Sequence, residues 1–401
     1  MFLIKIIIAV LIGNMLGTIT GIIPGIHINM VSLFIFNMLA LLLRVADPLT
    51  IGVTIVSMAI THTFTNIIPS IYLGAPDEST ALCVLPGHKM LLNGEGHGAV
   101  LLTLVGSLCS LILTLPLFPI LIYILRVSYP ILKPFIGHIL LSICIFLVLK
   151  EKHSKLWALI VFMLAGVFGI LVLNSPGLDE PLFPMLSGLF GVSTLIISMI
   201  QNIKIPEQKI GNVEIDNKLA YKTIFSSVII GNFASFLPGL GTSQAAILGS
   251  QFIKNIKEKG FLVLVGGIST VNMLASFVTW HVINKERNGA IVIVSDIVGE
   301  LTTEKMVIFI GAALSSCFFA VLFSIQISKK FSIYIKKVNY LVLCLSVILF
   351  ISFLVVFMSG TFGFFVFLIA TSIGLIPIFK GIGKNYLMGC LLVPIILYFL
   401  L

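Results

Sequence analysis

Long apolar runs constrain this chain more than any other feature of its sequence. Several windows of 18 or more residues carry almost no charge, for example 98–125 and 338–358. Such windows are typical of helices that cross a membrane. Of all residues, 59% are hydrophobic and 10% are charged, whereas a soluble domain carries about 25% charged residues. The sequence therefore predicts an all-α, polytopic protein embedded in the lipid bilayer of the cell membrane.

The net charge of +9 does not indicate a nucleic-acid partner. Most of the 24 Lys and Arg residues lie in short loops between apolar runs, as the positive-inside rule expects. The six Cys form no C-x-x-C pair, so we expect neither disulfides nor a metal site, and no cofactor. The N-terminal run has no cleavage signal, and we interpret it as the first helical segment of the mature protein.

Two Pro-Gly turns interrupt apolar segments, in GIIPGIHIN (21–29) and in FLPGLGTSQ (236–244). A turn in hydrocarbon must be buried in protein or face a wet cavity, because its backbone groups need partners. The helix piece that follows such a turn begins with up to four free amides, which together with the helix dipole attract anions. A packed proline kink is the alternative for either turn alone; the recurrence of the motif favours a site. The predicted substrate-binding residues here are Pro24, Gly25, His27, Asn29, Pro238, Gly239, Gly241, Thr242 and Ser243.

Polar residues also crowd two otherwise apolar spans, in THTFTN (61–66) and in STVN (269–272). An asparagine is costly to leave unpaired in a membrane, so we expect Asn66 and Asn272 to line the substrate site. His62 is either a proton carrier or a packing residue. Asp77 and Glu78 are either buried ion ligands or solvated at the interface. The coupling-ion candidates are His62, Thr63, Asp77, Glu78 and Ser269.

The two turns also suggest an internal repeat. When Pro24 is aligned with Pro238, Gly17 falls on Gly231, and with a slightly different offset Asn66 falls on Asn272. We therefore expect a first membrane repeat (1–201), a polar linker (202–222) and a second membrane repeat (223–401). Each repeat is predicted to contain a re-entrant or broken helical hairpin, followed by about five transmembrane helices. The expected spans are 49–72, 98–125, 129–150, 156–174 and 182–201, then 261–283, 306–328, 338–358, 361–378 and 385–401.

An odd number of spans inserts the second repeat upside down relative to the first. In that topology most Lys and Arg residues, including Lys380 and Lys384, fall in loops on one side, which makes that side cytoplasmic. The linker is then cytoplasmic and both chain termini are external. Segments 75–86 and 287–299 are treated as re-entrant or interfacial, and a crossing by either one would change the count.

These segments resemble the TctA permease family, the large membrane subunit of tripartite tricarboxylate transporters. GTITGIIPGIH (17–27) is similar to the family's G-x-x-x-G-x-x-P-G-x-G motif, with His27 in place of glycine, and GNFASFLPGLGTSQ (231–244) is similar to its second copy. STVNMLA (269–275) corresponds to the family's E-A-x-N-N-A, keeping Asn272 without the Glu. The resemblance implies an inverted-repeat permease for organic acid anions, driven by an ion gradient and often served by a small membrane subunit and an extracytoplasmic binding protein.

The leading hypothesis is a secondary active transporter of a small organic anion, a di- or tricarboxylate, coupled to H⁺ or Na⁺ and holding the anion between the two turns. The alternative is a translocase for phosphate-bearing lipid carriers. No paired carboxylates, Ser-Lys pair or H-E-x-x-H lies within the spans, and no G-x-x-x-x-G-K-[ST] loop is present, so we do not expect an enzyme. The patterns are compatible with a homo-oligomer without requiring one.

Overall fold

The computed structural model is built from helices and describes residues 2–23, 28–73, 84–151, 153–178, 181–200, 206–211, 213–237, 241–286, 288–335 and 339–401. No β-strand occurs within these ranges. The α-helices are α1 (Phe2–Ile22), α2 (Ile28–Asn37), α3 (Leu39–Leu42), α4 (Pro48–Thr65), α5 (Ile67–Tyr72), α6 (Val84–Leu92), α7 (Gly96–Thr114), α8 (Phe118–Leu132), α9 (Ile136–Leu149), α10 (Lys155–Leu173), α11 (Leu182–Leu186), α12 (Ser193–Ile200), α13 (Asn217–Phe236), α14 (Thr242–Phe252), α15 (Lys257–Ile283), α16 (Gly289–Val298), α17 (Thr303–Ile335), α18 (Tyr340–Lys380) and α19 (Gly389–Leu400). Short 3₁₀ or π-helical segments are η2 (Leu115–Leu117), η3 (Lys133–Phe135), η4 (Ser187–Val192) and η5 (Lys384–Met388).

Seven helical stretches in the described ranges are long and apolar enough to cross a membrane. They are Phe2–Ile22, Pro48–Tyr72, Gly96–Leu149, Lys155–Leu173, Lys257–Ile283, Thr303–Ile335 and Leu341–Lys380. Large apolar side chains cover their outer surfaces, including Ile4, Phe318 and Phe357, as is expected of helices that face lipid. The predicted all-α, polytopic fold is therefore confirmed.

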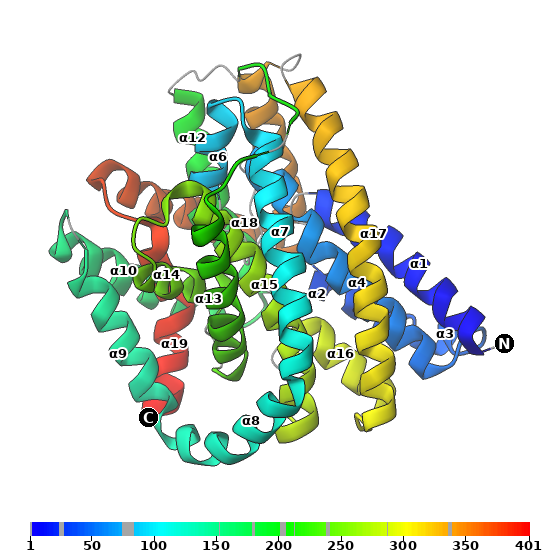
Figure 1. The fold of residues 1–401 in the computed structure, drawn as a ribbon. Helices are drawn as coiled ribbons and strands as arrows, with labels where there is room; N and C mark the ends of the chain where they lie inside the picture. Colours follow the sequence, from blue (N-terminus) through cyan, green and yellow to red (C-terminus); the bar gives the residue numbers. More distant parts are fainter. Residues whose placement is uncertain are drawn as a thin grey trace.

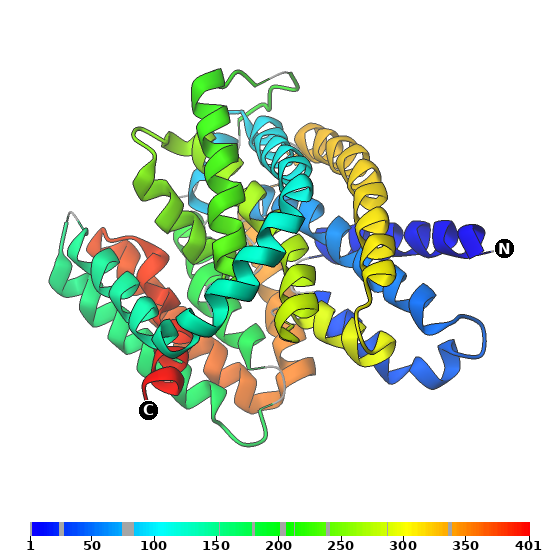
Figure 2. The same cartoon turned by 60° about the horizontal axis from the view of Figure 1, so that its bottom comes forward.

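Both interrupted helices are broken where the Pro-Gly turns predict. The helix α1 ends at Ile22 and α2 begins at Ile28, while α13 ends at Phe236 and α14 begins at Thr242. The two breaks have the same length and coincide in the alignment of Pro24 with Pro238. After the break between α1 and α2 the chain returns toward its start, so that the N-terminus and α3 lie at the same edge of the molecule (Figures 1 and 2).

Small residues bring the first helix of each hairpin against a central helix. A side chain at Gly17 of α1 would overlap the backbone of Met58 and the side chain of Thr61 in α4. A side chain at Gly231 of α13 would lie 2.8 Å from Val271 Cβ in α15. Small residues at every fourth position allow such close approach of membrane helices. They are Gly13, Gly17 and Gly21 in α1, and Ser227, Gly231 and Ser235 in α13.

These contacts also refine the internal alignment. Gly17 faces Met58 and Thr61, whereas Gly231 faces Ile268 and Val271. In this register Asn272 corresponds to His62, one helical turn away from the match to Asn66 suggested by sequence.

Each central helix packs against a helix of the other predicted repeat. Helix α4 packs along α17, and α15 packs along α7. In Figure 1, α4 and α17 run upward from their first residues, while α7 and α15 run downward. Corresponding helices thus run in opposite directions, and α4 and α15 contact one another at the centre.

Glycines at the far ends of the two repeats show the same reciprocity. Each leaves room for a backbone oxygen of the other repeat that a Cβ atom would crowd. The four contacts are Gly169 with Cys390, Gly374 with Leu189, Gly389 with Phe162, and Gly188 with Phe367. Exchanging the repeats converts the first contact into the second and the third into the fourth. This pattern supports the prediction of two related, oppositely oriented halves.

One predicted span has another boundary in the structure, and one predicted break is confirmed. Helix α7 ends at Thr114, and α8 then crosses the bottom of the molecule to reach α9 (Figure 1). The prediction of a single span over 98–125 was therefore too long. The prediction of a break between 358 and 361 agrees with Gly360, whose φ of 65° interrupts α18.

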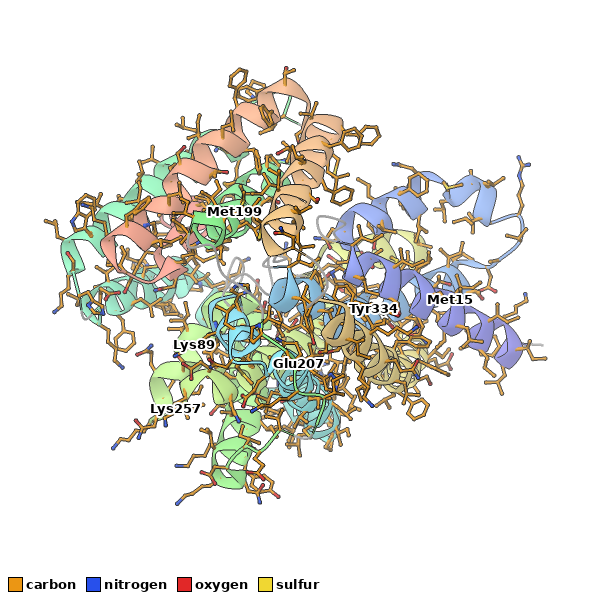
Figure 3. All side chains as sticks on the ribbon, turned by 90° about the horizontal axis from the view of Figure 1, so that it is seen from above. Met15, Lys89, Met199, Glu207, Lys257 and Tyr334 are labelled. Carbon is orange, nitrogen blue, oxygen red and sulfur yellow. The ribbon has the colours of Figure 1, made fainter. Side chains whose placement is uncertain are left out.

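The linker residues 206–211 are docked onto the upper end of the molecule. The side chain of Gln208 accepts a hydrogen bond from Gly96 N (2.9 Å), the first residue of α7, and donates one to Leu91 O (3.0 Å). Salt bridges between Lys89 and Glu258 and between Lys259 and Glu95 join the two predicted repeats here. Figure 3 shows Lys89, Glu207 and Lys257 close together in the view from above.

We expect Gly106→Ala to destabilise the protein, because a Cβ there would overlap the carbonyl oxygen of Val263 in α15. Overpacking of this kind costs about 1–3 kcal/mol. Thermal unfolding in detergent measures the loss. The matched control is Gly311→Ala on the exposed side of α17, where nothing lies within 4 Å, and its midpoint should not fall. Equal midpoints for the two variants would contradict the close α7–α15 contact.

Candidate functional site

The two central helices, α4 and α15, are buried along most of their length. Each has one polar side chain in this stretch that is not fully buried. Between residues 55 and 72, Thr63 is the only side chain that is not buried, and between 262 and 280 it is Asn272. The Thr63 hydroxyl donates to Ile60 O (2.8 Å). Within the described part of the chain, no hydrogen bond engages the Asn272 amide. Both side chains are therefore only partly buried, and the Asn272 amide can form hydrogen bonds with a further partner.

The break after α1 begins beside a second irregularity, at the junction of α4 and α5. A Cβ at Gly21 would overlap the side chain of Thr65 and would lie 3.1 Å from Asn66 N. Asn66 ends α4, is 3% exposed, and its carbonyl accepts a hydrogen bond from Ser70 Oγ (3.0 Å). The structure thus places Asn66 next to the end of α1, although largely out of reach of solvent.

Asn29 connects the first hairpin to the second repeat. It lies in the first turn of α2, and a Cβ at Gly289 would lie 2.6 Å from its Cγ. Gly289 begins α16, whose first turn is capped by the Asn288 side chain accepting from Ala290 N (2.9 Å). Asn29 therefore packs against the start of a helix of the other half.

Helix α14 begins without a side-chain cap. Its N-cap is Gly241, in an extended conformation, whose carbonyl accepts from Ala245 N (3.1 Å). Thr242, its first residue, is 7% exposed. A glycine N-cap supplies no side-chain oxygen for the first amides of the helix, and amides at such a helix start are the groups that bind anions in proteins.

Two coupling-ion candidates on the central helices, His62 and Ser269, are buried, whereas Thr63 is only partly buried. His62 is 3% exposed, and its Nδ1 lies 3.1 Å from Thr20 Oγ1 on α1. Ser269 is 6% exposed, three residues before Asn272 on α15. Five predicted site residues, along with two candidates for ion coupling, lie outside the described residues: Pro24, Gly25, His27, Pro238, Gly239, Asp77 and Glu78. The side chain of Ser243 lies outside them as well.

One charged residue that the sequence places in a loop is buried instead. Lys384 is 4% exposed, and its Nζ donates to Phe190 O (3.2 Å), Ser193 Oγ (2.8 Å) and Thr194 Oγ1 (2.6 Å). Its assignment to a solvated loop was wrong, because the partners lie in the first repeat. The only sequence signal is weak: Lys384 follows Gly-Ile-Gly and opens an apolar run.

Among the described side chains, no three of His, Cys, Asp or Glu gather as a metal site would require.

Comparison with known proteins places this arrangement in a family. The model of the "Tripartite tricarboxylate transporter TctA family" matches residues 7–389. The chain belongs to the TctA family. It is also 32% identical, over 355 residues, to the uncharacterized protein MJ1079 of Methanocaldococcus jannaschii, a match that covers 86% of this chain and 88% of the archaeal protein. No solved structure matches the chain.

Membership of the TctA family confirms the resemblance inferred from the Pro-Gly motifs. The family model spans both broken hairpins and the linker between them. This chain is therefore a multi-pass membrane component of a tricarboxylate transporter of the TctA type, and the family supports a transporter in preference to an enzyme.

Exposure of Asn272 gives a labelling prediction. In a background whose six cysteines are replaced by alanine, Asn272→Cys should react with a small water-soluble thiol reagent, because this side chain is only partly buried. Val271→Cys, on the next residue, should react far more slowly because Val271 is fully buried. Labelling is followed by mass spectrometry of the intact protein. Equal rates would mean that Asn272 does not face a wet cavity.

Proposed function

We propose that this TctA-family protein is a secondary active transporter. It moves a small organic anion, a di- or tricarboxylate, and couples this transport to an H⁺ or Na⁺ gradient. The observation that carries this proposal is the pair of matched helix breaks, at residues 23–27 and 237–241, one in each half. Each break is followed by a new helix, α2 in the first half and α14 in the second. The anion is held between these two helix starts near the membrane midplane.

The chemistry of the two helix starts suits a carboxylate. Free amides and the positive end of a helix dipole stabilise negative charge, by about 0.3–1 kcal/mol at exposed sites and more where water is excluded. The start of α14, which has no side-chain cap, and the side-chain amide of Asn272 would supply the donors. Such a site binds an anion reversibly, which transport requires.

The transport step follows from the arrangement of the halves. Opposite helix directions, reciprocal glycine contacts and crosswise packing all support two inverted repeats, residues 1–201 and 223–401, around a shared centre. In transporters of this architecture one unit rocks against the other around a fixed site. The α4–α15 contact between the halves is where such a shift would alternately expose the anion.

Sidedness and partners follow the same proposal. The linker lies at the top of Figure 1 and the C-terminus at the bottom, which supports a cytoplasmic linker and external termini. The family name describes a three-part transporter. We therefore propose that a small membrane subunit and an extracytoplasmic binding protein serve this chain, the latter delivering the anion to the external face.

Reconstituted liposomes test the function directly. Labelled citrate and succinate are offered under imposed H⁺ and Na⁺ gradients, with and without a candidate small membrane subunit and binding protein. We expect gradient-dependent accumulation of at least one carboxylate. If no carboxylate moves under either gradient while a lipid-phosphate translocation assay responds, the proposal fails and the lipid-carrier alternative replaces it.

Asn272→Ala should raise the KM for the carboxylate with a smaller effect on the maximal rate. A hydrogen bond to a charged ligand contributes about 1.5–3 kcal/mol, so the expected increase is roughly tenfold to a hundredfold. Ser315→Ala is the control, because Ser315 is exposed on α17 and its hydroxyl donates a hydrogen bond to Gly311 O of the same helix (2.9 Å). An unchanged KM for the Asn272 variant would remove this residue from the site.

A further inference from the structure

Three oxygen atoms form a cage around the ammonium group of Lys384. The cage belongs to the first half, at the end of the π-helical segment η4 and the start of α12, whereas the lysine belongs to η5 of the second half. Its three oxygens are Phe190 O, Ser193 Oγ and Thr194 Oγ1, at 2.6–3.2 Å from Nζ. Single-turn π-helical segments frequently occur at functional sites.

The hydrogen-bond pattern of the cage favours the charged form of the lysine. Each hydroxyl has one proton. Ser193 Oγ donates its proton to Leu189 O (2.7 Å), and Thr194 Oγ1 donates its proton to Phe190 O (2.6 Å). Both hydroxyls can then only accept from Nζ, as does the carbonyl. Three acceptors require three donors, which a charged ammonium has and a neutral amine lacks.

No carboxylate on the surrounding helices balances this charge. The elements that pack against η5 are α10, α14, α18 and α19, and their sequences contain no Asp or Glu. The same is true of η4 and α12. Glu151, in the loop before α10, interacts with Tyr386 two residues further along η5, and Lys384 forms no ion pair with any described residue. Within the described residues, only oxygen dipoles contact this ammonium group.

Neutral carbonyl and hydroxyl oxygens are the ligands that hard monovalent cations prefer. Potassium channels replace the hydration shell of the ion with carbonyl oxygens, and unwound carbonyls coordinate sodium in transporters with broken helices. The cage around Lys384 has this donor set. An ammonium group of similar charge and size therefore occupies a position that suits a dehydrated Na⁺ or K⁺.

We propose that Phe190, Ser193 and Thr194 form a monovalent-cation site that the ammonium of Lys384 fills as a tethered, permanent cation. The lysine joins the two halves through this site and makes it independent of external sodium. Helix η5 also packs against α14, so the fixed positive charge lies one element away from the second helix start. Its attraction for the transported anion rests on the proposed function; the cation site itself does not.

The test removes the tethered cation and offers a free one. Methionine reproduces lysine as far as Cε and leaves the Nζ position open. We expect the thermal midpoint of purified Lys384→Met in choline chloride to be well below that of the wild type. Replacing choline by sodium or potassium at constant ionic strength should raise this midpoint by several degrees, since a ligand that binds only the folded state stabilises it. The wild-type midpoint should not respond.

Two further variants make the test specific. Lys380→Met is the matched control, because Lys380 is exposed and stacks over Trp157 (4.2 Å from Nζ to the ring centroid); it should show no response to sodium. Lys384→Met combined with Thr194→Val should lose the response by removing one cage oxygen. A Lys384→Met protein whose midpoint is the same in choline, sodium and potassium, or that aggregates equally in all three, overturns the proposal.

A transport measurement then separates the cation site from the proposed function. In liposomes that take up carboxylate, Lys384→Met should lose at least about tenfold in uptake without alkali cations, the penalty expected for three acceptors left without donors, and should recover with sodium. A protein that transports no carboxylate, yet shows the sodium-dependent midpoint, refutes the proposed function and retains the cation site.

Discussion

The need to satisfy backbone hydrogen bonds in hydrocarbon governs the rest of this structure. A helix that stops inside a membrane exposes amides and carbonyls that cannot form hydrogen bonds with lipid tails. Helices α1 and α13 both stop inside the bundle, and so both must be covered by protein. Their small residues let α4 and α15 approach closely enough to do this. The central helices are in turn almost wholly buried, which leaves their few polar openings as the natural place for a ligand.

The crosswise packing follows from the same constraint. Each covering helix belongs to the same half as its broken hairpin, but it is itself enclosed by a helix of the other half: α17 encloses α4, and α7 encloses α15. Neither half therefore has a complete core alone. In the proposed transport step, a relative shift of the halves would alter the surroundings of both breaks at once, and the close backbone contacts at Gly169 and Gly374 lie between the halves.

Some of this was predictable from sequence, for a physical reason. The breaks were predictable because proline and glycine interrupt helices wherever they occur, and the structure begins α2 and α14 within a residue of the expected positions. The turn between α7 and α8 was missed, although Pro116 marks it. Hydropathy reports that a segment is apolar and not which direction it runs, so a transverse apolar helix such as α8 looks like a continued span.

Two other features depend on contacts between distant segments. The register of α4 against α15 differs by one helical turn from the sequence match, because weak matches at helical spacing fit equally well one turn away. Lys384 looked like a loop lysine because a charge at the start of an apolar run is normally solvated. The oxygens around its ammonium group come from residues near position 190. No local sequence pattern around Lys384 predicts these contacts.

The balance of buried charge connects the fold to the kind of solute it suits. Among the described residues, the buried side chains that can carry a charge are His62, His88, His97 and Lys384, and no Asp or Glu is buried. All four carry positive charge when protonated. Burial disfavours the charged form of a histidine, and Lys384 is the one of the four whose nitrogen is shown with three oxygen partners. The described core therefore holds no buried carboxylate that could bind sodium, and the sign of its best-stabilised charge suits an anion, as the proposed function requires.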